Sequence, residues 1–265
     1  MSTIRTSDSY NRVLLLFNTQ YVEMKIAFVG DVHCHYELLH DLDVDVILQV
    51  GDFGIYPRPD KIDPKTLAKN DTTFFMDYWK GKRKFKIPIF FVRGNHEDNE
   101  FLLKEAYKLR NEKTGIVELL PNLYWITDGR IFLYEDLAIL GMGGIHATGT
   151  WDLTVSQRKG KRFNHFSKFD FAVANYEIDV WLNSLYNAAC NYTKIFISHE
   201  APTHEPPPGI KLYSHFGDCK PIADLVKRWN PIVARFGHYH YNHQIDLPNI
   251  DAKIMKINSV EIVEI

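Results

Sequence analysis

A chain of 265 residues, 45% of them hydrophobic and 24% charged, is long enough to bury the core of one large α/β domain or two small ones. Its formal net charge of −2 gives no global basic field that would argue for nucleic-acid binding. The three cysteines, Cys34, Cys190 and Cys219, lie far apart, which argues against a disulfide framework and favours a reducing compartment. We therefore expect a cytoplasmic protein.

The N-terminal residues 1–23 have no clear hydrophobic period. Their longest apolar run, residues 13–17, is too short for a membrane span or for the core of a signal peptide. Met24 stands directly before the first apolar run that is typical of a buried strand. We expect an extension at residues 1–23, a single domain at residues 24–265, and no membrane partner.

Strands and helices alternate along the first 110 residues. Apolar runs predict buried strands at residues 24–30, 44–50 and 87–92. Helical patterns follow at residues 36–42, at 72–79, and from a cap at Asp98 or Asn99 to Leu109. Repeated strand–helix pairs are typical of βαβ units, so the sequence predicts an α/β fold with parallel strands.

The next part of the chain opens with short strands separated by turns such as Asp128-Gly129, which indicates an antiparallel meander. These strands are predicted at residues 123–127, 130–134 and 137–142. Residues 148–168 have no clean period and are rich in Lys, Arg and aromatic residues. We expect them to form an inserted loop over the domain, called the cap segment below.

A long amphipathic helix is expected at residues 169–190. Its candidate core contacts are Val173, Tyr176, Val180, Leu182 and Leu185. One more helix is expected at about residues 221–229. The remaining strands are predicted at residues 192–197, 231–236, 243–246, 252–257 and 260–263.

Polar side chains follow five of the predicted strands. They are Asp31 with His33, Asp52, Asn95 with His96, His199, and His238 with His240. Each cluster alone has an ordinary explanation as a turn or as a hydrogen-bonding loop residue. Open α/β sheets bind ligands beyond the carboxyl ends of their strands, so the five clusters should converge in space. Their joint occurrence predicts a metal site.

The ligand types indicate the kind of metal. Carboxylate, imidazole and amide groups suit Mn²⁺, Fe, Zn²⁺, Co²⁺ or Ni²⁺, and the lack of thiolates argues against a structural zinc site. Two ions about 3.5–4 Å apart, joined by a carboxylate, can supply hydroxide near neutral pH and attack a phosphorus centre. We expect two divalent ions, with Mn²⁺ favoured. The candidate ligands are Asp31, His33, Asp52, Asn95, His199, His238 and His240.

The combined pattern resembles that of the calcineurin-like metallophosphoesterase superfamily, D-x-H, G-D, G-N-H-[ED], H and G-H-x-H. This chain carries Asp31-Val32-His33, Gly51-Asp52, Gly94-Asn95-His96-Glu97, His199 and Gly237-His238-Tyr239-His240, in that order. The resemblance covers roughly residues 24–265. It implies a four-layer α/β/β/α sandwich of two mixed sheets flanked by helices, with a dinuclear metal site at the carboxyl ends of strands.

The resemblance also implies a role for each motif residue. One metal would be held by Asp31, His33 and His240, the other by Asn95, His199 and His238, with Asp52 as the bridge. A metal-bridging hydroxide would attack phosphorus in line with the leaving oxygen, and His96 would protonate that oxygen. Because histidine ligands must be neutral, activity should fall in acid.

Arg93 precedes Gly94 as in the Ser/Thr protein phosphatase branch, where this arginine binds phosphate; the alternative is a salt bridge to Glu97 or Asp98. That branch also has G-D-x-V-D-R-G, and here Ile55 and Tyr56 stand at the positions of its second Asp and its Arg. This difference counts against a protein phosphatase and against dinucleoside tetraphosphatases. Gly-Asp-Phe followed by Asn-His-Glu is more similar to lariat-debranching enzymes and small phosphodiesterases.

Basic and aromatic residues are mixed at residues 158–166, a composition that can bind phosphate backbones and stack bases. A solvated charge run is the alternative interpretation. Residues 78–86 show a second mixture of this kind, and a nucleic-acid substrate gains weight if both segments flank the metal site. The weaker candidates for substrate binding are His146, Arg158, Lys159 and Arg162.

We therefore expect a dinuclear metal-dependent phosphodiesterase that acts on a nucleotide or nucleic acid. One alternative is a phosphomonoesterase or protein phosphatase of the same superfamily. The other is a non-catalytic scaffold with the same fold. Scaffolds usually lose a ligand or the His after Asn, and this chain keeps them all.

Overall fold

The computed structural model describes residues 23–62, 73–111, 113–184, 192–202, 205, 207–208 and 219–265. The N-terminal extension predicted at residues 1–23 therefore lies almost wholly outside the described residues. The same holds for Leu185 and Cys190. No helix in the described part of the chain is both long and apolar enough to span a membrane.

The first of two six-stranded sheets has the order β12-β1-β2-β3-β5-β4. Strands β1, β2, β3 and β5 are parallel, and the edge strands β12 and β4 are antiparallel to their neighbours. The strands span Lys25–Val29 (β1), Val46–Gln49 (β2), Ile89–Phe91 (β3), Ile116–Leu120 (β4), Leu123–Ile126 (β5) and Val260–Glu264 (β12).

The second sheet has the order β10-β11-β9-β8-β7-β6. Its central strands β11, β9, β8 and β7 are parallel, and β10 and β6 are antiparallel edges. The strands span Ile131–Tyr134 (β6), Leu137–Met142 (β7), Thr193–Ser198 (β8), Val233–Phe236 (β9), His243–Leu247 (β10) and Ile250–Ile254 (β11).

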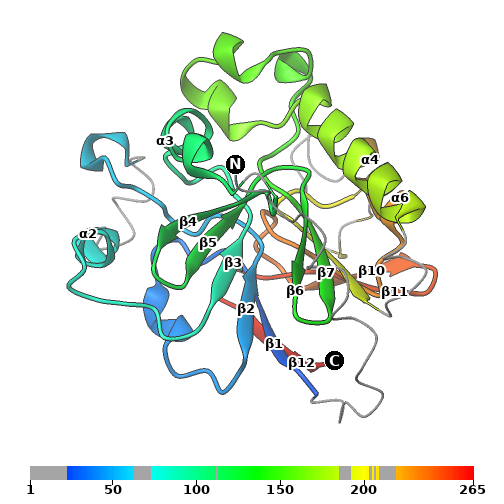
Figure 1. The fold of residues 1–265 in the computed structure, drawn as a ribbon, viewed down its shortest axis with the longest axis horizontal. Coiled ribbons are helices and arrows are strands. Elements are labelled where there is room, and N and C mark those ends of the chain that lie inside the picture. Colours follow the sequence, from blue (N-terminus) through cyan, green and yellow to red (C-terminus); the bar gives the residue numbers. More distant parts are fainter. Residues whose placement is uncertain are drawn as a thin grey trace, which may run out of the picture.

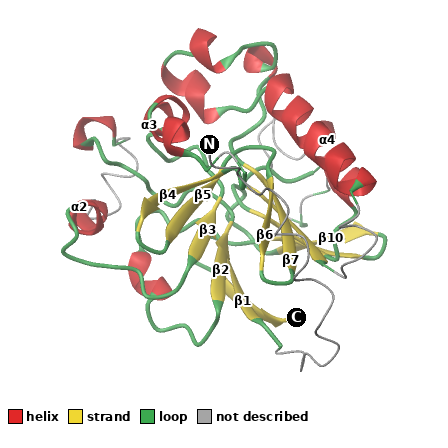
Figure 2. Ribbon diagram, in the orientation of Figure 1, coloured by secondary structure: helices red, strands yellow, loops and turns green. Residues whose placement is uncertain are grey.

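The two sheets pack face to face, and helices cover their outer faces (Figure 1). Helices α2 (Thr73–Trp79) and α3 (Asn99–Lys104) pack on the first sheet, and α4 (Lys168–Asn183) and α6 (Lys220–Trp229) on the second. A third core fills the space between the sheets with inward side chains such as Phe28. Figure 2 shows the same layers by secondary structure. The predicted α/β fold with two mixed sheets flanked by helices is confirmed.

Alternation along each strand explains this layering. In β1, Ala27 and Val29 belong to the core under α2 and α3, and Ile26 and Phe28 belong to the core between the sheets. Successive strand side chains point to opposite faces, so a strand buried on both faces is apolar throughout. This is why the central strands appear in the sequence as uninterrupted apolar runs.

The predicted antiparallel meander at residues 123–142 is confirmed for β6 and β7, which pair antiparallel, but is wrong for β5. β5 pairs in parallel with β3 in the first sheet, whereas β6 and β7 pair in the second sheet. The turn at Asp128-Gly129 carries the chain from one sheet to the other, and turn residues do not reveal which sheet the next strand joins. Strand β4 was not predicted.

The predicted core face of the long helix was also wrong. Tyr176, Val180 and Leu182 are exposed, and α4 instead buries Phe171, Ala174, Ile178 and Trp181. Apolar residues occur on several sides of this helix, so helical spacing alone did not identify the packed face.

The shorter predicted helices are partly 3₁₀ turns. These are η1 (Tyr36–Leu39) and η3 (Ala106–Leu109). Further 3₁₀ turns lie outside the predicted helices: η2 (Pro59–Lys61), and in the cap segment η4 (Thr148–Thr150), η5 (Val155–Gln157) and η6 (Gly160–Asn164). The predicted cap at Asp98 is present, since its carboxylate accepts the N–H of Phe101 at 3.2 Å.

Candidate metal centre

The candidate ligands follow the carboxyl ends of β1, β2, β3, β8 and β9. Because strands within each sheet run in parallel here, their ends meet at one edge of the sandwich. Four of these residues have left-handed backbone: His33 (φ 46°), Asp52 (φ 52°), His238 (φ 71°) and His240 (φ 58°). Non-glycine residues adopt this conformation at a cost, and such strain gathers at functional sites.

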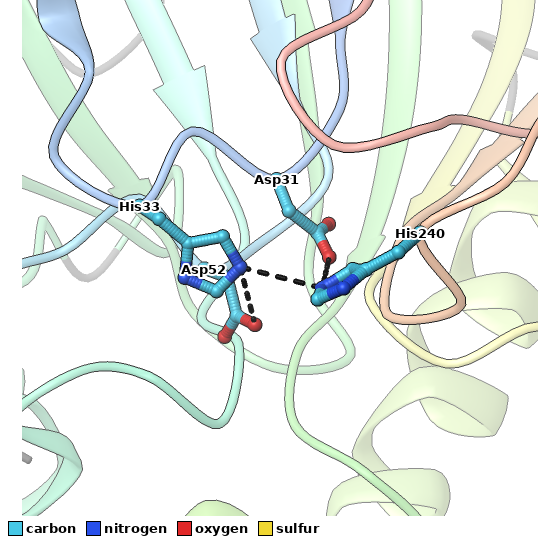
Figure 3. A group of neighbouring side chains, drawn as sticks. All are labelled: Asp31, His33, Asp52 and His240. Atoms are coloured by element: carbon cyan, nitrogen blue, oxygen red, sulfur yellow. Dashed lines mark hydrogen bonds and ion pairs between the residues drawn. The ribbon is translucent and has the colours of Figure 1, made fainter. Parts of the chain in front are cut away.

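Asp31, His33, Asp52 and His240 form one cluster whose potential ligand atoms all lie within 4.8 Å of one another. The two imidazole Nε2 atoms of His33 and His240 are 3.4 Å apart, and His240 Nε2 lies 3.2 Å from Asp31 Oδ2 (Figure 3). We call Asp31, His33 and His240 the first ligand group.

The second ligand group, Asn95, His199 and His238, adjoins the first across Asp52. His199 Nδ1 donates to the carbonyl oxygen of Val50 at 3.0 Å, so Nε2 carries the lone pair in the neutral ring. That nitrogen faces Asn95 Oδ1 at 3.0 Å. Asp52 Oδ1 also lies near His199 Nε2, so this nitrogen has two acceptor oxygens as neighbours. The ring of His238 lies beside that of His199, with centroids 5.0 Å apart.

Asp52 presents one oxygen to each group. Its Oδ1 is 3.4 Å from His199 Nε2, and its Oδ2 is 3.6 Å from His33 Nε2. Oδ2 is buried and has no hydrogen-bond partner among the described residues. A buried carboxylate oxygen without a donor is costly, and a cation would satisfy it. Asp52 and the first ligand group therefore fit a divalent cation.

Two glycines of the motifs allow this close approach. A Cβ on Gly94 would lie 2.1 Å from Asp52 Oδ1, and a Cβ on Gly237 would lie 2.4 Å from Asp31 Oδ1. Any other residue would displace a carboxylate from the centre.

Glu97 holds the loop that carries Asp52. Its carboxylate accepts backbone N–H groups from Phe53 (2.8 Å), Gly54 (3.0 Å), Ile55 (2.7 Å) and Gly94 (3.3 Å). Burial and the nearby Asp52 carboxylate raise the pKa of Glu97 to about 7, although these donors oppose the shift. Glu97 therefore acts through the backbone, as a support for the loop that carries Asp52.

His96 adjoins both Asp52 and the first ligand group. Its backbone N–H donates to Asp52 Oδ1 at 2.6 Å, and its ring centroid lies 5.0 Å from that of His33. The ring is only partly buried. His96 therefore lies beside Asp52 and His33, and part of it is accessible to solvent.

The charges of the site suit metal binding. Burial lowers the pKa of His33 and of His238, which keeps these rings neutral. The hydrogen bond to Asp31 raises the pKa of His240. Burial opposes ionisation of Asp52, but three neighbouring imidazoles, His199 foremost, outweigh it and hold the pKa of this carboxyl below its usual range.

The same sequence matches the family description "Calcineurin-like phosphoesterase" over residues 24–242. The chain belongs to the calcineurin-like phosphoesterase family. This confirms the resemblance inferred from the motifs, and it supports a hydrolase that uses divalent metal ions.

Individual relatives of this phosphoesterase are distant. It is 27% identical over 135 residues to the lariat debranching enzyme of Arabidopsis thaliana, which covers 46% of this chain and 30% of that enzyme. A solved structure aligns with 91% of this chain and 99% of its own, at 12% identity and a TM-score of 0.52, and shares the fold. The phosphopantetheinyl hydrolase of Mycobacterium tuberculosis aligns with 89% of this chain and 90% of its own, at 11% identity and a TM-score of 0.48.

Arg93 of the phosphoesterase forms a buried ion pair. Its side chain is fully buried, and Nε donates to Asp128 Oδ2 at 2.7 Å. The ion pair is therefore with Asp128, and not with Glu97 or Asp98. We do not retain Arg93 as a catalytic residue.

Arg158 is also a buried structural residue, since it donates to Asp170 Oδ2 at 2.9 Å and to the His165 carbonyl at 3.0 Å. Lys159 and Arg162 are exposed on the cap segment. The His146 ring stacks on Phe166, with centroids 5.8 Å apart. Of the predicted substrate-binding residues, only the two exposed bases and half-buried His146 remain candidates.

The second basic-aromatic segment, residues 78–86, reaches the neighbour of Asp52 through Phe85, whose ring centroid lies 5.8 Å from that of Phe53. It precedes the amino end of β3, whereas Asn95 and His96 follow the carboxyl end of that strand. The cap segment contacts the metal-binding loop directly, because Asn164 Nδ2 donates to the Asn95 carbonyl oxygen at 2.9 Å.

Three polar residues that shape the site were not identified from the sequence. Asp128 was interpreted only as a turn, and Asn164 as part of an irregular insert. Glu200 follows His199 directly; it accepts the backbone N–H of His146 at 3.1 Å and the hydroxyl of Tyr239. Their partners are distant in sequence, so no local pattern marks them.

Proposed function

We propose that this phosphoesterase is a two-metal phosphodiesterase that hydrolyses a phosphodiester of a nucleotide or nucleic acid. The observation that carries the proposal is the position of Asp52 between the two ligand groups, with an otherwise unpartnered Oδ2. A carboxylate shared by two cations would use both oxygens.

Each ligand group would hold one metal. Bound metals would stabilise negative charge on the phosphoryl oxygens. They would also lower the pKa of a bound water to near neutrality. The first group is Asp31, His33 and His240; the second is Asn95, His199 and His238; Asp52 is common to both. His96, beside Asp52 and partly exposed, would donate a proton to the leaving oxygen.

The charge of the pocket favours a diester. A phosphomonoester carries a charge of about −1.5 to −2 at neutral pH and needs more positive donors than a diester. Arg93 is buried against Asp128, and Arg58 is already paired with Asp98. Neither guanidinium is available as a second phosphate clamp.

Two observations support a nucleotide or nucleic-acid substrate. The relative at 27% identity is a lariat debranching enzyme, although the match covers only 30% of its length. In addition, the cap segment places exposed Lys159, Lys161 and Arg162 on the element that contacts Asn95. Basic side chains beside a phosphoesterase centre can bind neighbouring phosphates.

We also retain two proposals about the whole chain. The domain is proposed to span residues 24–265, with residues 1–23 as an extension, because β12 pairs with β1 from Val260 to Glu264, beyond the matched region. A cytoplasmic location is also proposed, because the three cysteines of the sequence lie far apart and form no CxxC pair.

The decisive experiment compares two ester classes. The protein is stripped of metal with a chelator, reloaded with Mn²⁺, and assayed with bis(p-nitrophenyl) phosphate and with p-nitrophenyl phosphate. We expect faster hydrolysis of the diester. Hydrolysis of the monoester alone would favour the monoesterase or protein phosphatase, and no hydrolysis with no bound metal would favour the non-catalytic scaffold.

A charge-reversal pair tests the substrate class. Lys159→Glu with Arg162→Glu should raise KM for a single-stranded oligonucleotide by about tenfold at low salt and leave hydrolysis of bis(p-nitrophenyl) phosphate unchanged. The matched control is Lys84→Glu with Lys86→Glu, two exposed lysines at the amino end of β3. Equal effects of the two pairs would show that the cap does not bind the substrate.

A further inference from the structure

Arg93 joins three segments of the chain at the edge of the metal centre. Nε donates to Asp128 in the turn between β5 and β6 at 2.7 Å. Nη1 donates to the Phe163 carbonyl at 2.9 Å and Nη2 to the His165 carbonyl at 3.2 Å, both in the cap segment. One buried guanidinium thus fixes the backbone on either side of Asn164.

Asn164 passes this constraint to the metal-binding loop. Its Nδ2 donates to the Asn95 carbonyl at 2.9 Å. Asn99 Nδ2 donates to the Gly94 carbonyl at 2.9 Å and lies 3.3 Å from Asn164 Oδ1. Two consecutive carbonyls of the loop are therefore held by side-chain amides, one of which comes from the cap segment.

We propose that Arg93 and Asn164 are positioning residues that use the cap segment to hold the Gly94–His96 backbone, and so orient Asn95 and His96 toward Asp52. This rests on the proposed function for its catalytic meaning. The geometry supports it directly, because the same loop donates the His96 N–H to Asp52 Oδ1 at 2.6 Å.

This role requires a side chain with several hydrogen-bond donors in one plane. The planar guanidinium reaches one carboxylate and two carbonyls at once, whereas a lysine has a single nitrogen. Removing the arginine also leaves Asp128 buried without its charge partner, which is strongly destabilising. Asn164→Ala is the milder test, since it removes one neutral amide and leaves the ion pair intact.

The first test measures the loop and the metal together. In Asn164→Ala, we expect faster hydrogen exchange at the Asn95 and His96 amides, and about tenfold weaker binding of one Mn²⁺ by calorimetry. kcat for bis(p-nitrophenyl) phosphate should fall while KM stays within about twofold, as expected when positioning rather than binding is lost. The matched control is Asn175→Ala, whose Nδ2 donates to the Phe171 carbonyl at 2.9 Å within α4.

The outcomes separate this proposal from the proposed function. Unchanged exchange and unchanged Mn²⁺ affinity in Asn164→Ala would overturn the positioning role. Faster exchange in a protein that binds no metal and hydrolyses no ester would support the structural coupling and overturn the proposed function.

A double-mutant cycle tests whether Arg93 acts through the cap. Arg93→Lys should weaken the same Mn²⁺ site, and most of that effect should disappear when Asn164 is already Ala. Additive effects would show that Arg93 supports the loop by another route. If Arg93→Lys does not fold, the exchange and calorimetry results for Asn164→Ala decide the proposal alone.

Discussion

The two ligand groups differ in how the protein surrounds them. The His240 side chain in the first group is 44% exposed, whereas that of His199 in the second is fully buried. His199 is also fixed by the Val50 carbonyl, and Asn95 is held through the cap segment. His199 and Asn95 of the second group are therefore fixed by contacts with other segments, whereas the first group, whose Asp31 and His33 are buried, has one exposed ligand, His240.

This difference indicates a division of work within one centre. Ligands oriented by further hydrogen bonds usually bind a metal more tightly than ligands without such support. An exposed ligand permits exchange of water and substrate. We expect the second group to bind its metal first and the first group to face the incoming phosphate.

The largest effect is expected where the groups meet. Asp52→Asn removes the charge but keeps a residue type that tolerates a φ of 52°. Mn²⁺ stoichiometry should fall below two per chain, and kcat should fall by more than the about 10–100-fold that changes in ligand-supporting groups cause. Calorimetry and steady-state kinetics check this. If the variant still binds two Mn²⁺ ions tightly, Asp52 is not the bridging ligand.

His96→Ala should reduce turnover without emptying either group. Loss of a positioned proton donor typically costs about 10²–10⁴-fold in rate. Metal content, measured by mass spectrometry after gel filtration, should stay at the level of the unmodified protein. Loss of both metals would show that His96 is a ligand and not the acid.

Matched substitutions in the two groups compare them directly. His199→Ala leaves the Val50 carbonyl without its donor, so the metal-free protein should lose about 1–3 kcal/mol of stability. His240→Ala changes a half-exposed side chain, so stability should stay within about 0.5 kcal/mol. Chemical denaturation in the presence of a chelator measures both. Equal losses would contradict the contrast between the groups.

The smallest predicted effect is a pH dependence in the cap segment. Burial, with Arg93 and Arg158 nearby, lowers the pKa of His165 from 6.5 to about 4. The unfolded chain then binds a proton that the folded chain does not, so stability is lost as pH falls from 6.5 toward 4.

His165→Gln should reduce that acid-dependent loss. Solvent screens this half-buried ring, so we expect the change in Tm to shrink by only about 2–4 °C. Thermal unfolding at pH 7 and pH 5 measures it. An identical acid-dependent loss in both proteins would assign the effect to other groups.

Short motifs in the sequence were sufficient to predict the candidate metal ligands. Gly94 and Gly237 stand where a Cβ would meet a carboxylate, and each lies next to a candidate ligand in the sequence. Such motifs are readable because the turn, the ligand and the close approach are adjacent along the chain. The apolar runs before them indicated buried strands for the same local reason.

Contacts between segments that are distant in the sequence could not be predicted from such motifs. The turn pattern predicted β5 and β6 to be neighbours in one meander, although they belong to different sheets. It also showed Arg93 beside Glu97 and Asp98, although its carboxylate partner is Asp128. The sheet that a strand joins and the carboxylate that pairs with Arg93 both depend on how distant segments pack together.

The sequence by itself determined the family, the α/β class and the candidate ligands, because each ligand lies directly after an apolar strand. Tertiary structure decided which group each oxygen of Asp52 faces, which side of α4 is buried, and that Arg93 supports the cap segment. These depend on contacts between segments more than thirty residues apart, such as Arg93 with Asp128, and no local pattern encodes such distances.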